Sequence, residues 1–220
     1  MGGTAVSKRP AMQSVSKVVL CVHPFYRSGR GFSHDPNPMI KDGSAVEFMR
    51  KFWEGEMERH VKEEPESFMI FVGANTEPGY MEAHERGLLR KAQEIFNGRL
   101  EFLGIRMAGD SRFQALKSWL HPLISRKATG TAFGEYTTVC VVREAEFMQW
   151  ELEIPVMIDR YASVDVEYAG DRHSVLEQEA NGGVAERTGT HPYGLILDQQ
   201  RRHVPVIDFL NLEAYRQSTG

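Results

Sequence analysis

The alternation of short apolar runs with amphipathic segments is the feature that most constrains how this chain can fold. Apolar runs of strand length occur at 17–22, 67–75, 100–110 and 133–142. Segments with apolar residues at helical spacing separate them, at 43–63, at 79–98 and from residue 110 onwards. Four strands joined through three helices are typical of right-handed βαβ units on a parallel sheet. We therefore predict an α/β fold: a three-layer sandwich with an open, mainly parallel, Rossmann-like sheet.

Local signals mark where two of these helices begin. Ser44 followed three residues later by Glu47 forms a capping box, which predicts a helix start at this point. Asp110 or Ser111 is expected to cap the third helix, because short polar side chains accept hydrogen bonds from the first free N–H groups of a helix. Pro122 is then expected to kink or end that helix.

The last third of the chain has a different pattern, with apolar and polar residues in alternation. This pattern predicts strands at 147–154 and 163–169 and a closing β-hairpin made by 194–198 and 203–210. The glycine-rich, charged stretch 169–192 between them is expected to be a long, mobile loop. The expected organisation is a flexible tail at 1–16, an α/β core at 17–145 and a β-rich extension of the same domain at 146–220.

The charge of the chain is unevenly distributed. The formal net charge is −4, but residues 1–34 carry five basic residues and no acidic one, so the remainder sums to −9. An acidic body disfavours nucleic acid as a partner, because phosphate-backbone affinity relies on a broad basic face. A metal-dependent nuclease using Glu135, Glu144 and Glu146 is disfavoured for the same reason. The basic N-terminal segment instead favours local capture of one small anion.

Cysteine content and hydropathy bear on location. The two cysteines, Cys21 and Cys140, lie in apolar runs and are too few for a disulfide framework or a thiolate zinc site. No apolar run reaches the length of a membrane helix, and the first residues lack the apolar centre of a secretory signal. We expect a cytoplasmic protein that does not bind membranes.

Candidate site residues follow from the predicted sheet, because ligands of open parallel sheets bind beyond the carboxyl ends of the strands. Two residues there suit proton transfer, His23 and Asp110, and we predict a catalytic role for them. Each also has a plain structural explanation, since His23 can bond to nearby backbone and Asp110 can cap a helix. Residues expected to bind an anionic substrate at the same edge are Arg27, Ser28, Arg30, Asn75, Ser111 and Arg112.

Common catalytic motifs do not occur in the sequence. There is no G-x-S-x-G elbow, no G-x-x-x-x-G-K-[ST] phosphate loop and no G-x-G-x-x-G after the first strand. Histidine and cysteine spacing matches no common metal-site pattern, so no metal site is predicted, and the cofactor stays open.

The leading hypothesis is a small-molecule enzyme or ligand-binding domain that recognises a phosphorylated or nucleotide-like anion at the strand carboxyl edge. If it is an enzyme, the expected reaction is that of a hydrolase or transferase. The alternative is a non-catalytic, oligomeric binding or assembly protein, in which the strands of the last third supply the interface.

Overall fold

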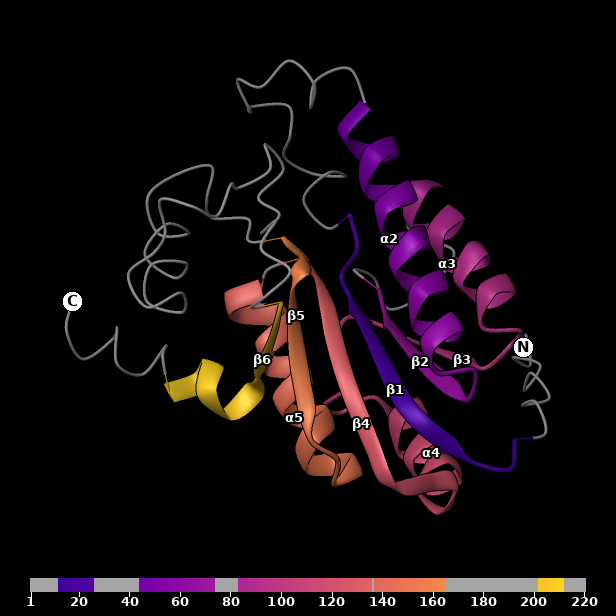
Figure 1. The fold of residues 1–220 in the computed structure, drawn as a ribbon, viewed down its shortest axis with the longest axis vertical. Coiled ribbons are helices and arrows are strands. Elements are labelled where there is room, and N and C mark those ends of the chain that lie inside the picture. The colour runs from indigo at the N-terminus through magenta and orange to yellow at the C-terminus, as the bar shows by residue number, and fades with distance from the viewer. Residues whose placement is uncertain (1–11, 26–43, 74–82, 136, 165–201, 212–220) are drawn as a thin grey trace.

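The computed structural model describes residues 12–25, 44–73, 83–135, 137–164 and 202–211. These residues form a six-stranded sheet with strand order β3-β2-β1-β4-β5-β6 (Figure 1). The strands are β1 (Val15–Val22), β2 (Ser67–Val72), β3 (Leu100–Leu103), β4 (Ile124–Glu135), β5 (Val156–Val164) and β6 (His203–Pro205). All neighbouring pairs are parallel except β5 and β6, which are antiparallel.

Helices cover both faces of this sheet. They are α2 (Ser44–Glu63), α3 (Ala83–Ile95), α4 (Ser111–Leu120) and α5 (Val142–Leu152). In Figure 1, α2 and α3 lie on one face of the sheet, and α4 and α5 lie on the other. The predicted α/β three-layer sandwich with a mainly parallel, Rossmann-like sheet is confirmed.

The residues of β1 show why the sheet needs two helical layers. Val19 and Cys21 pack into the apolar cluster that contains Trp53 of α2, whereas Val18 and Leu20 pack into the opposite cluster under α4 and α5. Successive side chains of a strand point to opposite faces. An uninterrupted apolar run is therefore buried on both sides, as in other parallel sheets.

The fourth strand lies earlier in the chain than the sequence predicts. Strand β4 spans Ile124–Glu135, and residues 137–141 form a π-helical turn, η4 (Thr137–Val141), that continues into α5. The prediction of a strand at 133–142 is therefore wrong over most of its length. The first half of β4 carries exposed Arg126 and Lys127, so it lacks the apolar run that marks a buried strand. The run 137–142, in which every residue except Cys140 is β-branched, is instead helical, because tertiary packing outweighs its β propensity.

The strand predicted at 147–154 is also wrong, because 142–152 form α5. Ala145, Met148 and Leu152 are buried at helical spacing, and Trp150 is 69% exposed. A short alternating pattern fits a helix as well as a strand, and here the buried face has the helical period.

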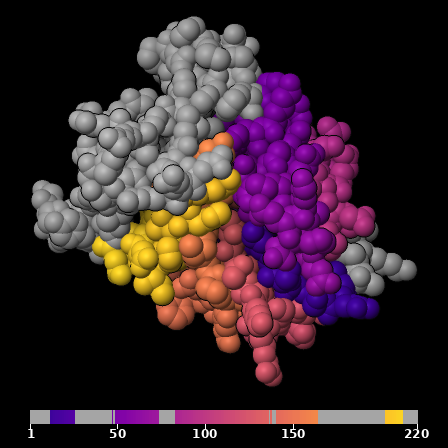
Figure 2. All heavy atoms as spheres, in the orientation of Figure 1, coloured from indigo at the N-terminus to yellow at the C-terminus, as the bar shows by residue number. Residues whose placement is uncertain are grey.

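Only part of the predicted C-terminal strand pattern falls on described residues. Strand β5 begins at Val156, seven residues before the predicted strand at 163–169, and the description stops at 164. Strand β6 covers the first three residues of the predicted strand 203–210, and 206–211 are helical. Its antiparallel partner is β5. Figure 2 shows residues 202–211, in yellow, at the surface beside α2. The predicted strand 194–198, the loop 169–192 and residues 1–11 of the predicted tail lie outside the described residues.

The two ends of α4 lie close to the positions that the sequence marks. Asp110 is the N-cap of α4, as predicted, and its carboxylate accepts the backbone N–H of Arg112 at 2.9 Å. A short 3-10 turn follows α4 at His121–Leu123, with Pro122 inside it.

Among the described helices, none combines the length and the apolar character needed to cross a bilayer.

Candidate functional site at the carboxyl edge of strands β1 and β4

The strand order places a topological switch point between β1 and β4. The chain leaves β1 towards β2 and β3 on one side, and after β3 it returns through α4 to β4 on the other side. Connections therefore diverge above the carboxyl ends of β1 and β4, and crevices at such points are where open α/β sheets bind ligands. We call this region the switch-point edge; its described residues are 23–25, 73, 104–110, 134–135 and 137–144.

Strands β1 and β4 approach each other very closely at this edge. Gly134 has a φ of 138°, and a Cβ atom added to it would lie 2.0 Å from the carbonyl oxygen of Val22. Only glycine fits such a position, because any side chain would collide with backbone.

The backbone leaving β1 is strained. His23 and Phe25 have φ values of 47° and 65°, in the left-handed region that non-glycine residues rarely adopt. The backbone N–H of Phe25 donates to the carboxylate of Glu135 at 3.1 Å, and its ring packs edge-on against Trp53. Strain of this kind costs about 1–3 kcal/mol per residue and is concentrated at ligand sites and active sites.

The His23 side chain is buried and fixed in one orientation. Its Nε2 lies 2.7 Å from the carbonyl oxygen of Ile105, so Nε2 carries the proton and donates. Burial lowers the pKa of His23; the hydrogen bond to Ile105 opposes this shift and the charge of Arg106 adds to it. The ring is therefore neutral at pH 7, and Nδ1 is its basic nitrogen.

Three buried glutamates surround this end of the sheet. Glu85 of α3, Glu135 at the end of β4 and Glu144 of α5 are each at most 3% exposed. Glu144 accepts the backbone N–H of Met107 at 2.9 Å, and burial raises the pKa of its carboxyl. Burial raises the pKa of the Cys21 thiol, and the negative charges of Glu85 and Glu135 raise it further, which places both carboxylates near the end of β1.

Sequence reasoning did not select these glutamates as residues of an anion site. The sequence suggested Glu135 and Glu144 only for a disfavoured metal-dependent nuclease, and with β4 placed at 124–135 Glu135 is the last residue of a strand. Glu85 carries no comparable signal, since an acidic residue in the first turn of a helix is ordinary.

The predicted residues Asp110, Ser111 and Arg112 are brought together as one capping unit. Asp110 pairs with the guanidinium of Arg112 at 2.6 Å and also accepts the N–H of Gly104 at 3.3 Å. Burial alone would raise the pKa of Asp110, but the hydrogen bonds from Arg112 outweigh burial and lower it. Ser111 is exposed at the start of α4. The loop that Asp110 holds is the one that reaches His23 through Ile105.

Four other predicted residues, Arg27, Ser28, Arg30 and Asn75, lie outside the described residues. Within the described part of this edge, two exposed arginines supply positive charge, Arg106 after β3 and Arg143 in α5. Burial raises the pKa of the Cys140 thiol, and both arginine charges oppose that rise. Both guanidinium groups therefore act on the first turns of the helical run that follows β4.

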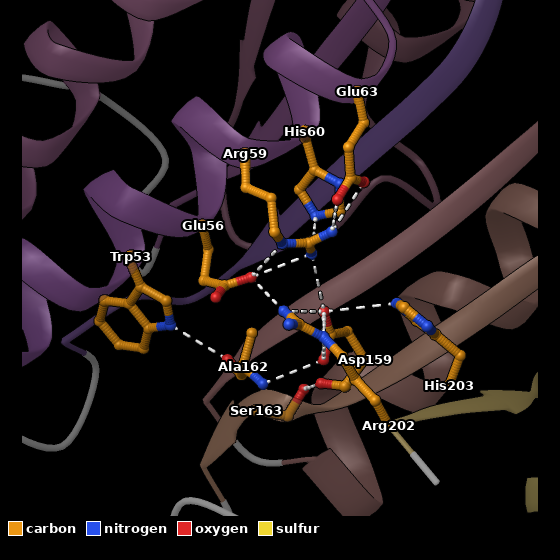
Figure 3. Close-up of polar contacts among 10 residues, drawn as sticks. All are labelled: Trp53, Glu56, Arg59, His60, Glu63, Asp159, Ala162, Ser163, Arg202 and His203. Atoms are coloured by element: carbon orange, nitrogen blue, oxygen red, sulfur yellow. Dashed lines mark hydrogen bonds and ion pairs between the residues drawn. The ribbon is translucent and has the colours of Figure 1, made fainter. Parts of the chain in front are cut away.

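A second cluster of ionisable groups lies away from this edge, between α2, β5 and β6 (Figure 3). We call it the buried ion-pair network; its members are Glu56, Arg59, Asp159 and Arg202. Arg202 contacts Glu56 and lies 2.6 Å from Asp159, and Arg59 lies 3.0 Å from Glu56 and 3.5 Å from Asp159. Each carboxylate therefore contacts two guanidinium groups.

The same region has the donor types of a metal site. Ligand atoms of Glu56, His60 and Asp159 lie within 4.8 Å of one another, and all three residues are buried. A cation there would meet two guanidinium groups that already neutralise the carboxylates. The arrangement is therefore that of an internal ion-pair network, which joins α2 to β5 and β6.

The electrostatics of the network agree with this interpretation. Burial lowers the pKa of His60 to about 2, helped by the charges of Lys17 and Arg59, so the ring is neutral. Burial would raise the pKa of Asp159, but hydrogen bonds from His203 and Arg202 outweigh it and lower the pKa. The charged form of Asp159 is thus favoured, as expected for an internal ion-pair network.

Comparison with models of known protein families, with curated proteins and with solved structures gives no match for this chain.

Proposed function

We propose that this protein binds a small phosphorylated or nucleotide-like molecule at the switch-point edge and acts on it as a hydrolase or transferase. One observation carries the proposal: the strained residues His23 and Phe25 end β1 at the switch point, where Glu135 fixes the backbone of Phe25. A fold does not maintain two strained residues beside a buried carboxylate without compensation, and ligand recognition is the common reason.

The chemical groups at this edge suit two tasks, proton transfer and the binding of an anion. The basic Nδ1 of the neutral His23 ring suits proton transfer at neutral pH. Asp110, with its lowered pKa and its capping bonds, is the weaker of the two predicted catalytic candidates. Arg106 and Arg143, which the structure describes, supply positive charge for an anion. We retain as proposed substrate-binding residues Arg27, Ser28, Arg30, Asn75, Ser111 and Arg112.

Thermal-shift measurements over a panel of nucleotides, sugar phosphates and non-phosphorylated analogues test this proposal. A ligand at ten times its dissociation constant should stabilise the native state by about 1.4 kcal/mol. Arg106→Gln with Arg143→Gln should reduce the shift, whereas Arg126→Gln should not, because Arg126 is exposed at the opposite end of β4. If no phosphorylated compound stabilises the wild-type protein, the proposal is wrong. Incubation of the protein with each stabilising compound, with product formation measured by chromatography, tests whether the protein is an enzyme. The His23→Gln variant serves as the comparison.

The alternative of an oligomeric assembly protein has support from a different surface. Trp150 and Ile207 are 69% and 57% exposed and line one shallow groove of about 330 Å³ with Ile154 and Pro155. Exposed apolar groups gathered in one place are typical of contact surfaces. Light scattering over a range of concentrations distinguishes the two functions, with Trp150→Gln as the variant. A monomer at every concentration would exclude self-assembly.

A cytoplasmic location is part of the same proposal. Both cysteines are free thiols, Cys21 buried and Cys140 half-buried, which suits a reducing compartment.

A further inference from the structure

The helical run after β4 begins at the switch point. Residues 137–141 form the π-helical turn η4, which continues without a break into α5 up to Leu152. The run starts two residues after Glu135, the last residue of β4, and β4 is the direct neighbour of β1. The N–H groups of its first turn therefore point towards the proposed ligand site. Free N–H groups and the helix dipole make such an end favourable for an anion.

A buried hydroxyl lies at this same helix end. Thr137 is the first residue of the run and is 5% exposed. Among the described residues, its Oγ1 has no hydrogen-bond partner. Side chains in a helix tilt towards the N-terminus, so the side chain of this first residue lies on the N-terminal side of the first turn. A buried hydroxyl without a partner destabilises the native state, and a bound acceptor would recover that loss.

Two positive side chains act electrostatically on the same helical run. Arg143 follows Thr137 by six residues, and Arg106 comes from the loop after β3; both are exposed and close enough to oppose the raised pKa of Cys140. Cations near a helix N-terminus are repelled by the dipole. Glu144 balances one of the two charges, and its carboxylate is held by the N–H of Met107. Glu135 and Glu85 are further carboxylates at this end of the sheet, so the attraction for an anion comes from the N–H groups and the hydroxyl, and the two arginines offset the carboxylate charge.

We infer that the N-terminus of the helical run 137–152 is the subsite for the phosphoryl group of the ligand. The Thr137 hydroxyl and the first N–H groups of the run donate to the phosphate oxygens, and Arg106 and Arg143 supply positive charge beside them. This inference depends on the proposed function and adds where the phosphate lies. It predicts that phosphate monoesters bind through the phosphate, whether the rest of the molecule is a nucleoside or a sugar.

Calorimetric titration of the full-length protein with inorganic phosphate, AMP and ribose 5-phosphate tests the inference, at constant ionic strength set with chloride. Thr137→Val keeps the shape and removes the hydroxyl, so it should weaken all three by tenfold or more. Without phosphate, the same variant should melt about 2 °C higher, because the unpaired hydroxyl is gone. Thr137→Ser should retain binding. Thr129→Val, at an exposed position of β4, is the matched control and should change neither property.

The backbone amides of Thr137 and Cys140 provide a readout that needs no variant. Their NMR resonances should shift in proportion to bound phosphate. If the wild-type protein binds AMP, but Thr137→Val binds it equally and these amides do not move, the subsite is elsewhere and the proposed function stands. If none of the three compounds binds to the wild type and the wider panel also gives no shift, the proposed function and this inference are both wrong.

Discussion

The carboxylate of Glu135 accepts the backbone N–H of Phe25 at 3.1 Å, across 110 residues of sequence. This bond joins the end of β4 to the strained segment that leaves β1. Glu135→Ala leaves a buried N–H without this acceptor, so it should lower the free energy of unfolding by about 1–3 kcal/mol. Glu135→Gln retains an acceptor oxygen and should cost less than half as much. Urea denaturation measures both variants, and equal losses would contradict the assigned role of the hydrogen bond.

The buried ion-pair network should be far more sensitive to substitution than the ion pairs on the surface. Arg202→Ala removes one of the two guanidinium groups beside Glu56 and Asp159, so it should lower the free energy of unfolding by about 3–5 kcal/mol. Arg50→Ala removes pairs with Glu47 and Glu54 on the outer side of α2 and should cost about 1 kcal/mol or less. Chemical denaturation of the two variants side by side gives the comparison. Similar losses would show that the network adds no more than surface pairs do.

The free energy of unfolding should decrease as the pH is lowered, because histidine in the unfolded chain becomes protonated. The native pKa of His60 is about 2, against an ordinary value of 6.5, so below pH 6.5 the unfolded chain takes up a proton that the native protein does not. Stability present above pH 6.5 is then lost as the pH falls towards 2, by about 1.4 kcal/mol per unit. His23 acts in the same direction, and Asp159 acts only below about pH 3.8.

The contribution of His60 can be separated from the others by substitution. Between pH 7 and pH 5, His60→Gln should lose about 2 kcal/mol less stability than the wild type loses. Urea midpoints at the two pH values measure the difference. Identical losses in the two proteins would mean that His60 titrates normally in the native state.

Two glycines should respond to alanine in opposite directions. Gly134→Ala puts a Cβ atom 2.0 Å from the carbonyl oxygen of Val22 at a φ of 138°, so β1 and β4 must separate at the site. We expect this variant to be insoluble or to melt at least 10 °C lower, well beyond the few degrees of an ordinary substitution in a protein of this size. Gly87→Ala, inside α3 with nothing within 4 Å, should gain about 0.5–1 kcal/mol. Thermal melts of both variants test these expectations. A stable Gly134→Ala variant would exclude the close approach of β1 and β4 at this position.

The parts of the fold that the sequence predicted correctly are those in which each strand is buried on both faces. The runs around Val19 and Ile70 read as strands because both of their faces require apolar residues. Strand β4 escaped prediction because its first half borders solvent and its second half contains small residues, among them Gly130 and Gly134. Gly130 has no room for a side chain, since Met148 and Val156 would lie within 2.8 Å of an added Cβ atom. Close packing selected residues that do not look like strand formers.

The place of His23 after the first strand could be predicted from the sequence, but most of the groups around it could not. The rule that ligands bind beyond strand carboxyl ends located His23 from its place after an apolar run. Glu135 and Thr137 depended on the correct end of β4, which the sequence did not supply. The contact of Glu56 with Arg202 could not be inferred from spacing at all, because the sheet order that brings α2 near β6 is a property of the whole fold.

The network also has a consequence for the order in which the chain folds. Glu56 and Arg202 are 146 residues apart, so the contact closes only after the chain has been synthesised as far as residue 202. Before that, docking α2 on β5 would bury Glu56 and Asp159 with Arg59 as their remaining partner, which is costly for two carboxylates. We therefore expect β1, β2 and β3 to assemble with α3 first, and the packing of α2 against β5 to be completed last, when residues 202–211 arrive. Contacts this distant in sequence are also the slowest to form during refolding.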